Sequence, residues 1–253
     1  MKIAVITGAS SGMGKEFVRR ICDIKELDEV WVIARRAERL EELKNEVKTP
    51  VRAISLDLTD SKSFDEYKRM LEEASPEVSV LVNASGYGKF ESFKNLSLEE
   101  QLGMIDLNDK ALVAITYITL PYLKRGSEVY QIGSLSSFQP VPYISVYGAT
   151  KAFVLSFTRA VNAELKKTGI KMMAVSPGWV KTEFFDRAVV DDSIITYYYQ
   201  IFTPEQVVTR AIKDMKKGRD VSVVGPMIRA QVLLVKLIPH RLAMWIWLKQ
   251  QKK

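Results

Sequence analysis

The chain has 253 residues, of which 47% are hydrophobic and 26% charged, a composition typical of a globular domain and not of a disordered or fibrous protein. The net charge is +7, but six basic residues and no acidic residue follow Asp220, so residues 1–220 carry only +1. A nucleic-acid-binding surface needs a basic stripe interleaved with aromatic residues, and none precedes residue 221. We therefore expect no nucleic-acid partner.

Cysteine and histidine are too scarce for disulfides or metal sites. Cys22 is the only cysteine and His240 the only histidine, so no intrachain disulfide can form, and no cluster has metal-ligand spacing. The start, MKIAVITGAS, holds four consecutive apolar residues before a polar turn, which is too short for the apolar region of a signal peptide. We expect a cytoplasmic protein without a metal, in which His240 is exposed.

Seven short runs rich in apolar and β-branched residues alternate with segments of helical period, a pattern typical of a parallel sheet between two layers of helices. Runs such as IAVI and VWVI are continuously apolar, as expected where helices cover both faces of the sheet. The sequence predicts one doubly wound α/β domain over residues 1–225, with a seven-stranded parallel sheet. Its predicted strands are Lys2–Ile6, Val30–Ala34, Val51–Ser55, Val78–Val82, Glu128–Ile132, Lys171–Val175 and Asp220–Val224.

Two helix starts carry capping residues. The segment Ser97 to Glu100 fits a capping box, and Thr203 to Gln206 adds a proline, Pro204, at the first helical position. We expect an irregular insertion over residues 183–203 and a separate tail over residues 226–253.

The first predicted strand runs into a glycine-rich turn that is followed by a helical segment. Glycines allow a tight turn and a close approach of the backbone to a pyrophosphate, which the N-terminus of the helix attracts. A plain strand-to-helix turn is the alternative. The turn predicts a dinucleotide site built from Gly8, Ser10, Ser11, Gly12, Met13 and Gly14.

The end of the second predicted strand indicates which dinucleotide is bound. Dinucleotide folds usually have an acidic residue there for the adenine ribose, but this chain has Arg35 and Arg36. A guanidinium can bind a 2′-phosphate with two hydrogen bonds, whereas a carboxylate would repel it. These residues favour NADP(H) over NAD, unless the arginines are only solvated residues at a helix start.

Tyr147 and Lys151 are four residues apart on a predicted helix, so both side chains lie on one face. A free tyrosine has a pKa of about 10 and is a poor base at neutral pH, but a nearby ammonium stabilises the phenolate. Such a pair can exchange a proton with a substrate oxygen. Taken alone, the spacing is also typical of surface neighbours.

In this order, these residues resemble the short-chain dehydrogenase/reductase family. The family pattern is TGxxxGxG, an Asn on a mid-chain helix, a Ser, and YxxxK thirteen residues after that Ser, and it is matched by Thr7 to Gly14, Asn108, Ser134, Tyr147 and Lys151. The resemblance covers residues 1–225 and implies a Rossmann-type fold. It continues in Asp57-Leu58, Asn83-Ala84-Ser85-Gly86 and Pro177-Gly178-Trp179-Val180-Lys181-Thr182.

The resemblance implies roles for the matched residues. Tyr147 would be the general acid/base, and Ser134 would hydrogen-bond the substrate oxygen. Lys151 would bind the nicotinamide ribose and lower the pKa of Tyr147, and Asn108 would hold a water that extends the proton relay to solvent. Further cofactor contacts would come from Asp57, Leu58, Asn83, Ala84, Gly86, Pro177, Gly178, Val180 and Thr182.

The chain departs from the family pattern at two positions. Ala84 and Ser85 stand where the family usually has Asn and Ala, which affects the local hydrogen bonding. Ser136 and Ser137 follow Ser134 closely, so the assignment of Ser134 rests on the thirteen-residue spacing.

In this family the segment after the Pro-Gly motif is a mobile loop over the substrate, here residues 183–203. Its many apolar and aromatic residues predict a bulky apolar substrate, such as a steroid, bile acid or long-chain ketone. The alternative is that these residues pack against the body of the protein or a partner subunit. The expected substrate contacts are Ser134, Tyr147, Phe138, Tyr143, Trp179 and Phe184.

The tail, residues 226–253, combines helical apolar stretches with six basic residues and two tryptophans, Trp245 and Trp247. Its charges interrupt it too often for a membrane-spanning helix. Tryptophan and basic residues without acids fit a helix on an anionic membrane surface, but packing over the substrate loop or against another subunit explains them too.

The sequence therefore predicts an NADP(H)-dependent, hydroxysteroid dehydrogenase-like oxidoreductase that interconverts a ketone and a secondary alcohol. The alternative is a catalytically silent NADPH-binding regulator or scaffold, against which the complete set of Asn108, Ser134, Tyr147 and Lys151 argues. The chain is short for a nucleotide-sugar epimerase or dehydratase. The resemblance also favours a homodimer or homotetramer formed through the helices that carry Asn108 and Tyr147.

Overall fold

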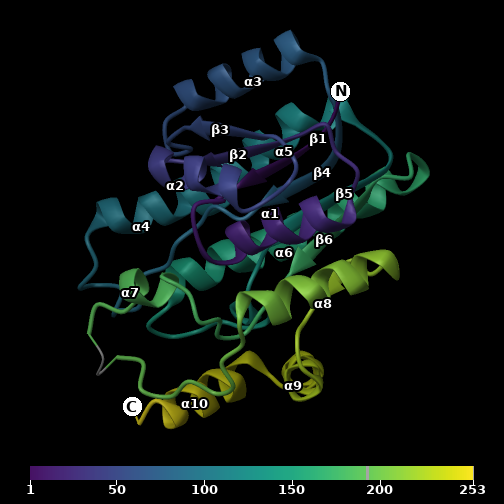
Figure 1. Ribbon diagram of the computed structural model, residues 1–253. Coiled ribbons are helices and arrows are strands. Elements are labelled where there is room, and N and C mark those ends of the chain that lie inside the picture. Colours follow the sequence, from purple (N-terminus) through teal and green to yellow (C-terminus); the bar gives the residue numbers. More distant parts are fainter. Residues whose placement is uncertain (192–193, 253) are drawn as a thin grey trace.

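A computed structural model describes residues 1–191 and 194–252, so two residues of the predicted substrate loop and Lys253 lie outside the described residues. Seven parallel strands form one sheet in the order β3-β2-β1-β4-β5-β6-β7, which confirms the predicted fold (Figure 1). The strands are β1 (Lys2–Thr7), β2 (Glu29–Ala34), β3 (Val51–Ser55), β4 (Glu77–Asn83), β5 (Leu123–Ile132), β6 (Lys171–Val175) and β7 (Val221–Ser222).

Two strands differ in length from the prediction. β5 begins five residues earlier, at Leu123, because Leu123 pairs with Val78 on β4 beyond a register shift. β7 is only two residues long, because it is an edge strand that pairs with Ala174 and Val175 of β6 alone.

Helices cover both faces of the sheet. Side chains alternate along each strand, so in β1 Ala4 and Ile6 pack on one face while Ile3 and Val5 pack on the other. The first face is covered by α1, α2 and α8, and the second by α3, α5 and α6. The helices are α1 (Gly12–Ile24), α2 (Ala37–Glu42), α3 (Lys62–Ala74), α4 (Leu98–Ile105), α5 (Ala111–Thr119), α6 (Ser145–Glu164), α7 (Phe184–Ala188), α8 (Pro204–Lys216), α9 (Pro226–Leu237) and α10 (His240–Gln250).

Both predicted capping residues begin helices. The Ser97 hydroxyl accepts a hydrogen bond from the Glu100 amide at the start of α4. Thr203 and Gln206 form a reciprocal capping box at the start of α8, with Pro204 in its first turn. These caps fix where the chain re-enters the body after each long connection.

The strand order reverses between β1 and β4, since the chain moves outward to β3 and then returns to the other side of β1. In open parallel sheets the crevice at the carboxyl ends of such strands is where ligands bind. The glycine-rich turn follows β1 and residues 84–86 follow β4, so both predicted cofactor segments lie at this crevice.

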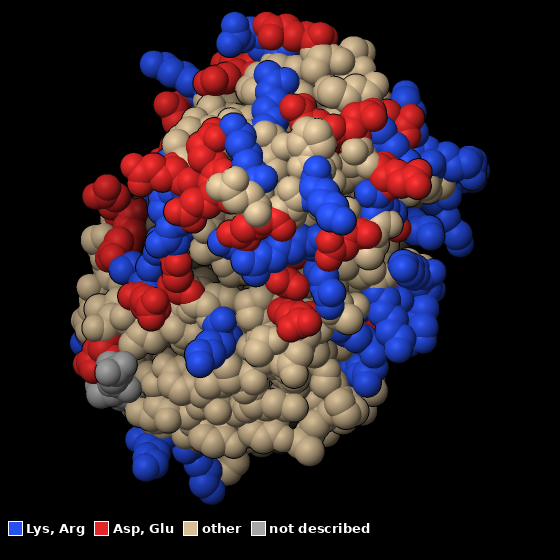
Figure 2. Space-filling model, in the orientation of Figure 1, with Lys and Arg blue, Asp and Glu red and all other residues tan. Residues whose placement is uncertain are grey.

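The tail forms α9 and α10, which lie together at one end of the molecule (Figure 1). Trp247 Nε1 donates to the Pro142 carbonyl at 3.1 Å, and the Gln251 side chain accepts from the amides of Thr196 and Tyr197 at 2.8 and 3.0 Å. Among the described residues, no helix combines the length and apolar character needed to cross a bilayer. Figure 2 shows both charge signs mixed over the upper part of this view, while the lower part, around α9 and α10, is largely uncharged.

A buried carboxylate holds α8 against the end of the sheet. Asp214 is 1% exposed and accepts hydrogen bonds from Arg210 at 2.7 Å, Arg219 at 3.0 Å and Ser222 of β7 at 2.9 Å. This cluster sets the position of β7, from which the chain enters α9.

We expect Asp214→Ala to lower the free energy of unfolding by about 2–3 kcal/mol, because Ser222 loses a buried partner while both arginines can still reach water. Chemical denaturation measures this change. Glu72→Ala removes one side of the exposed pair Lys68–Glu72 and serves as the control, with an expected change below about 0.5 kcal/mol. Equal effects of the two variants would contradict the structural role of Asp214.

Candidate functional site

One cavity of about 570 Å³ runs along the carboxyl ends of the strands and continues beneath the tail. It brings most of the predicted residues together. Those that line it are Gly8, Ser10, Ser11, Gly12, Met13, Gly14, Arg35, Arg36, Asp57, Leu58, Ala84, Gly86, Ser134, Phe138, Tyr147, Lys151, Pro177, Gly178, Trp179, Val180, Thr182 and Phe184.

The glycine-rich turn is shaped so that side chains cannot fit. Gly8 has φ +65°, and a Cβ there would lie 2.6 Å from the backbone of Ala84. A Cβ on Gly14 would lie 2.2 Å from the Gly8 carbonyl oxygen. The turn is therefore folded tightly onto the start of α1 and lines the cavity, as expected for a pyrophosphate site at the N-terminus of a helix. The residues present fit a dinucleotide.

The two predicted arginines lie in different environments. Arg36 Nη2 donates to the hydroxyls of Ser10 and Ser11, both at 3.0 Å, and so points at the glycine-rich turn. Arg35 is more exposed and pairs with Asp57 at 3.7 Å. Because Arg36 already contacts the turn that would hold a cofactor phosphate, it is better placed than Arg35 for the 2′-phosphate of the adenine ribose.

A carboxylate from the substrate loop occupies the same arginine cluster. Glu183 Oε2 accepts from Arg36 Nη1 at 2.9 Å, and Glu183 also pairs with Arg39. Hydrogen bonds from Arg36 and then Arg39 lower the pKa of Glu183, so it is ionised at neutral pH. Sequence reasoning missed Glu183 because it precedes an aromatic segment and carries no motif of its own; only the fold brings it across the cavity to the end of β2.

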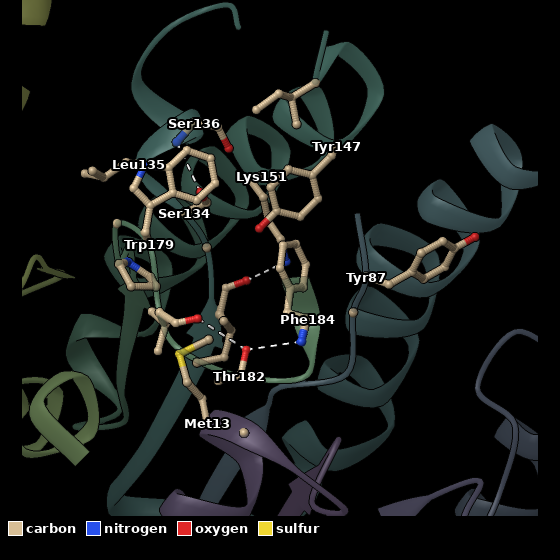
Figure 3. Close-up of a pocket in the computed structure, with 18 of the residues that line it drawn as sticks. Met13, Tyr87, Ser134, Leu135, Ser136, Tyr147, Lys151, Trp179, Thr182 and Phe184 are labelled. Carbon is tan, nitrogen blue, oxygen red and sulfur yellow. Dashed lines mark hydrogen bonds between the residues drawn. The ribbon is translucent and has the colours of Figure 1, made fainter. Parts of the chain in front are cut away.

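Tyr147 and Lys151 project from α6 into the cavity, with Ser134 beside them (Figure 3). Burial raises the pKa of Tyr147 to about 12, and a hydrogen bond with Ser134 opposes this shift. Lys151 Nζ lies 5.6 Å from the centre of the Tyr147 ring and donates to the Ile132 carbonyl at 2.8 Å. The predicted lowering of the Tyr147 pKa is thus absent in this arrangement, where burial is the largest influence.

The neighbouring serines are distinguished by their partners. Ser137 is used within the protein, since its hydroxyl donates to the Lys151 carbonyl at 2.7 Å. Ser134 accepts from the Ser136 amide at 3.2 Å and lies on the cavity wall next to Tyr147. This arrangement supports the choice of Ser134 over Ser137 that the spacing suggested.

Asn108 lies on a π-helical turn, Asp106–Lys110, and is fully buried behind the cavity wall. Its side chain accepts from the Tyr87 amide at 3.0 Å and donates to the Tyr87 carbonyl at 2.9 Å and to Thr150 Oγ1 at 3.0 Å. Insertion of one residue into a helix, as in such a turn, is frequent at functional sites. Here it directs Asn108 toward the backbone that lines the cavity.

The next residue, Asp109, is a titratable group that sequence analysis did not consider. One carboxyl oxygen, Oδ1, is buried without a hydrogen-bond partner among the described residues. Burial raises the pKa of Asp109 to about 7, and the Lys151 ammonium opposes this shift. Burial lowers the pKa of Lys151 to about 8, and the Asp109 carboxylate opposes that shift in turn.

Aromatic rings cover Tyr147. The Phe184 ring lies 5.4 Å from the Tyr147 ring, and Phe90 lies 5.9 Å from both Phe184 and Trp179 (Figure 3 shows Phe184 facing Tyr147). Trp179 also packs on Tyr198 of the substrate loop at 5.0 Å. The part of the cavity next to Tyr147 is therefore apolar and aromatic.

Two predicted contacts do not line the cavity. Asn83 is buried and donates to Thr116 and Gln131, because its side chain points into the body between β4 and α5. Tyr143, in a left-handed turn with φ +66°, packs against the cluster of Phe90 and Ile195 instead of facing the cavity. The side chains of Asn83 and Tyr143 therefore lie away from the cavity lining, and their roles at the adenosine and at the substrate stay predictions.

The tail supplies cavity residues that sequence analysis left unassigned. They come from one side of α9 and α10, whose helical period places them together. The spacing of apolar residues in the tail indicated that each helix has an apolar side, but it did not indicate that this side covers the cavity. These residues are Ile228, Gln231, Val232, Leu234, Val235, Ile238, Ala243, Ile246, Trp247 and Gln250.

Comparison with known proteins agrees with this geometry. The family model for short chain dehydrogenases matches residues 2–192. The chain belongs to the short chain dehydrogenase family. It is an oxidoreductase, as the names of its relatives in this family also state.

The names of three similar proteins refer to different cofactors and substrates. The NADP-dependent 3-hydroxy acid dehydrogenase YdfG of Escherichia coli is 33% identical over 81% of this chain and 85% of its own. A Sphingobium yanoikuyae enzyme solved with NADPH has a TM-score of 0.77 at 27% identity, over 88% and 87% of the chains. A bulky-bulky ketone specific alcohol dehydrogenase of Comamonas testosteroni has a TM-score of 0.73 at 25% identity, over 88% and 86%.

We expect Glu183→Gln to bind NADPH several-fold to about tenfold more tightly, because the 2′-phosphate no longer competes with an ionised carboxylate for Arg36. NADH affinity should change by less than about twofold, since NADH has no 2′-phosphate. Titration of each cofactor into the purified protein measures both.

Glu205→Gln is the matched control, because Glu205 is an exposed carboxylate that pairs with Arg20 outside the cavity. Weaker NADPH binding by Glu183→Gln would mean that Glu183 supports the cofactor site and does not compete with it.

Proposed function

We propose that this protein is an NADP(H)-dependent oxidoreductase that interconverts a ketone and a secondary alcohol on a bulky apolar skeleton, such as a steroid, bile acid or long-chain ketone. The observation that carries the proposal is the position of Tyr147. Its side chain lines the same cavity as the glycine-rich turn and packs against the aromatic ring of Phe184. NADP(H) is the cofactor, and a guanidinium that contacts the serines of the glycine-rich turn, that of Arg36, supports a role in binding the 2′-phosphate.

When bound, the nicotinamide supplies or accepts the hydride. Tyr147 donates a proton to the substrate oxygen during reduction and removes it during oxidation. Ser134 hydrogen-bonds the same oxygen and stabilises the charge that develops on it. Lys151 holds the ribose and returns a proton to Tyr147, and Asn108 connects Lys151 to a water on the route to solvent.

The protonation states fit the reducing direction at neutral pH. With a pKa of about 12, Tyr147 carries its proton, and with a pKa of about 8, most Lys151 side chains carry theirs. Reduction of a ketone needs a protonated tyrosine and a second group that can return a proton to it. Tyr147 and Lys151 meet these two needs. Oxidation needs the phenolate, which the burial of Tyr147 beneath Phe184 disfavours.

The aromatic wall favours an apolar substrate over a small anion. Three of the cationic side chains that line the cavity, Arg35, Arg36 and Arg187, lie close to carboxylates: Arg35 to Asp57, and the other two to Glu183. Phe184, Phe90 and Trp179 surround the remaining space next to Tyr147. Transfer of an apolar skeleton from water into this space is favourable, whereas a carboxylate would lose its hydration.

We also propose that the protein forms a homodimer or homotetramer through α4, α5 and the helix of Tyr147, α6. Exposed apolar side chains gather on these helices, and such clusters mark interfaces between proteins. They are Leu98, Leu102, Ile105, Tyr117 and Phe153, which are between 42% and 77% exposed.

Initial rates with a panel of ketones test the proposed reaction. We expect NADPH to be preferred over NADH, steroid, bile-acid and long-chain ketones to react faster than short polar ketones and 3-oxo acids, and Tyr147→Phe to lose at least about 1000-fold in kcat. Faster turnover of the short polar substrates would overturn the apolar assignment. Tight NADPH binding without turnover of any ketone would support the regulator hypothesis instead.

A pH profile tests the link between Asp109 and Lys151. An Asp109 carboxylate stabilises the Lys151 ammonium, so Asp109→Asn lowers the pKa of Lys151 further, and the ammonium is lost at a lower pH. We expect the high-pH limb of kcat/KM for ketone reduction to move to lower pH. The control is Asp106→Asn, which removes the exposed partner of Lys110 and should leave the limb in place. If Asp109→Asn leaves the high-pH limb of kcat/KM unchanged, Asp109 does not influence the proton route through Lys151.

A further inference from the structure

The tail helices have a second side that the cavity does not use. Residues of α9 and α10 such as Val232, Val235 and Ala243 are buried toward the cavity. The opposite side carries large apolar side chains in contact with solvent. We name this side the outer face and define it by Leu233 and Leu237 of α9, which are 63% and 83% exposed, and Leu242 and Trp245 of α10, which are 43% and 56% exposed.

Helical period places these residues together. Leu233 and Leu237 are four residues apart on α9, and Leu242 and Trp245 are three residues apart on α10, so each pair lies on one side of its helix. Only Ile238 and Pro239 separate the two helices, which both lie at the same end of the molecule (Figure 1). An exposed apolar surface of this kind on a globular protein marks an interaction site.

The charged side chains of the tail itself are of one sign. No acidic residue follows Asp220, whereas the described part of the tail holds Arg229, Lys236, Arg241, Lys249 and Lys252. In Figure 2 no acidic side chain lies over the part of this view that α9 and α10 form. Apolar residues flanked by lysine, arginine and tryptophan match an anionic bilayer surface, where the apolar side enters the headgroup boundary and the basic residues meet lipid charges.

We propose that the outer face of α9 and α10 docks on the surface of an anionic lipid membrane. A second copy of the same face is a poor occupant, because a two-fold interface would place its basic residues opposite like charges without any tail carboxylate side chain to pair with them. The exposed apolar cluster on α4, α5 and α6 carries acids such as Glu99 and Asp106 and so differs in chemistry from the outer face.

The cavity reaches the edge of the outer face. Leu234 and Ile246 line the cavity and are still 56% and 36% exposed, so they lie at its rim between the two helices and solvent. Docking through the outer face therefore brings this rim to the lipid surface. If the proposed function holds, an apolar ketone can enter from the bilayer without crossing water; the docking itself does not depend on that reaction.

Flotation of the full chain with vesicles tests the proposal. We expect binding to vesicles of equal parts phosphatidylglycerol and phosphatidylcholine, weaker binding at high salt, and little binding to phosphatidylcholine alone. Absence of binding to the anionic vesicles, or equal binding to both compositions, would overturn it. Tyr147→Phe should float like the wild type, so a loss of the reaction and a loss of docking are distinguishable.

Matched variants locate the surface. Leu233→Ser with Leu237→Ser, and Arg241→Glu with Lys249→Glu, should each weaken vesicle binding by more than about tenfold. Ile24→Ser, and Lys166→Glu with Lys167→Glu, change exposed apolar and basic residues outside the tail and should bind as the wild type does. None of these residues lines the cavity, and circular dichroism reports whether each variant is folded.

The same variants decide against the other occupants. If Leu233→Ser with Leu237→Ser removes a dimer in analytical ultracentrifugation while no form floats, the outer face joins two copies of the chain and the membrane proposal fails. If the tail variants float as well as the wild type, the lipid contact lies elsewhere and the proposal also fails.

Discussion

The buried ammonium of Lys151 is the constraint on which the site depends. A buried cation must be hydrogen-bonded, and one of its donors is used by the Ile132 carbonyl at the end of β5. The backbone carbonyl of Lys151 accepts a hydrogen bond from the Ser137 hydroxyl. Lys151 thus joins α6 to the end of β5 through its side chain and to the short turn that follows β5 through its main chain. Tyr147 lies one helical turn before Lys151, and only Gly133 separates Ser134 from β5.

The burial that fixes these groups also sets their acidity. Loss of water raises the pKa of Tyr147 and lowers that of Lys151, so the proton stays on the tyrosine and moves more easily from the lysine. Asp109 lies behind this pair, and its own pKa near 7 results from the same burial. Lys151, beside the proposed acid, and Asp109, which acts on Lys151, both change charge between about pH 6 and 9, which is why the pH profile is the informative measurement.

The sequence was sufficient wherever local chemistry decides the structure. Continuous apolar runs predicted seven parallel strands, and glycines that admit no side chain predicted the turn after β1. The sequence was insufficient where residues distant in the chain decide the direction of a side chain. Arg35 and Arg36 are adjacent in the sequence, and only the hydrogen bonds to Ser10 and Ser11 show that the Arg36 side chain points toward the glycine-rich turn. Asn83 matched a motif of the family, yet its side chain donates a hydrogen bond to Thr116 of α5 inside the protein.

The tail also shows what could not be predicted from the sequence, and why. Periodicity reveals that a helix has an apolar side, but α9 and α10 have two, and a sequence does not say which one meets protein. The inner side covers the cavity through residues such as Val232 and Ala243, while the outer side leaves Leu237 more exposed than any other large apolar residue described. Gathered exposure of that kind is typical of interaction sites on globular proteins. A helix pair that closes a hydrophobic cavity from one side and meets a lipid surface with the other would join a poorly soluble substrate to its site through one structural element.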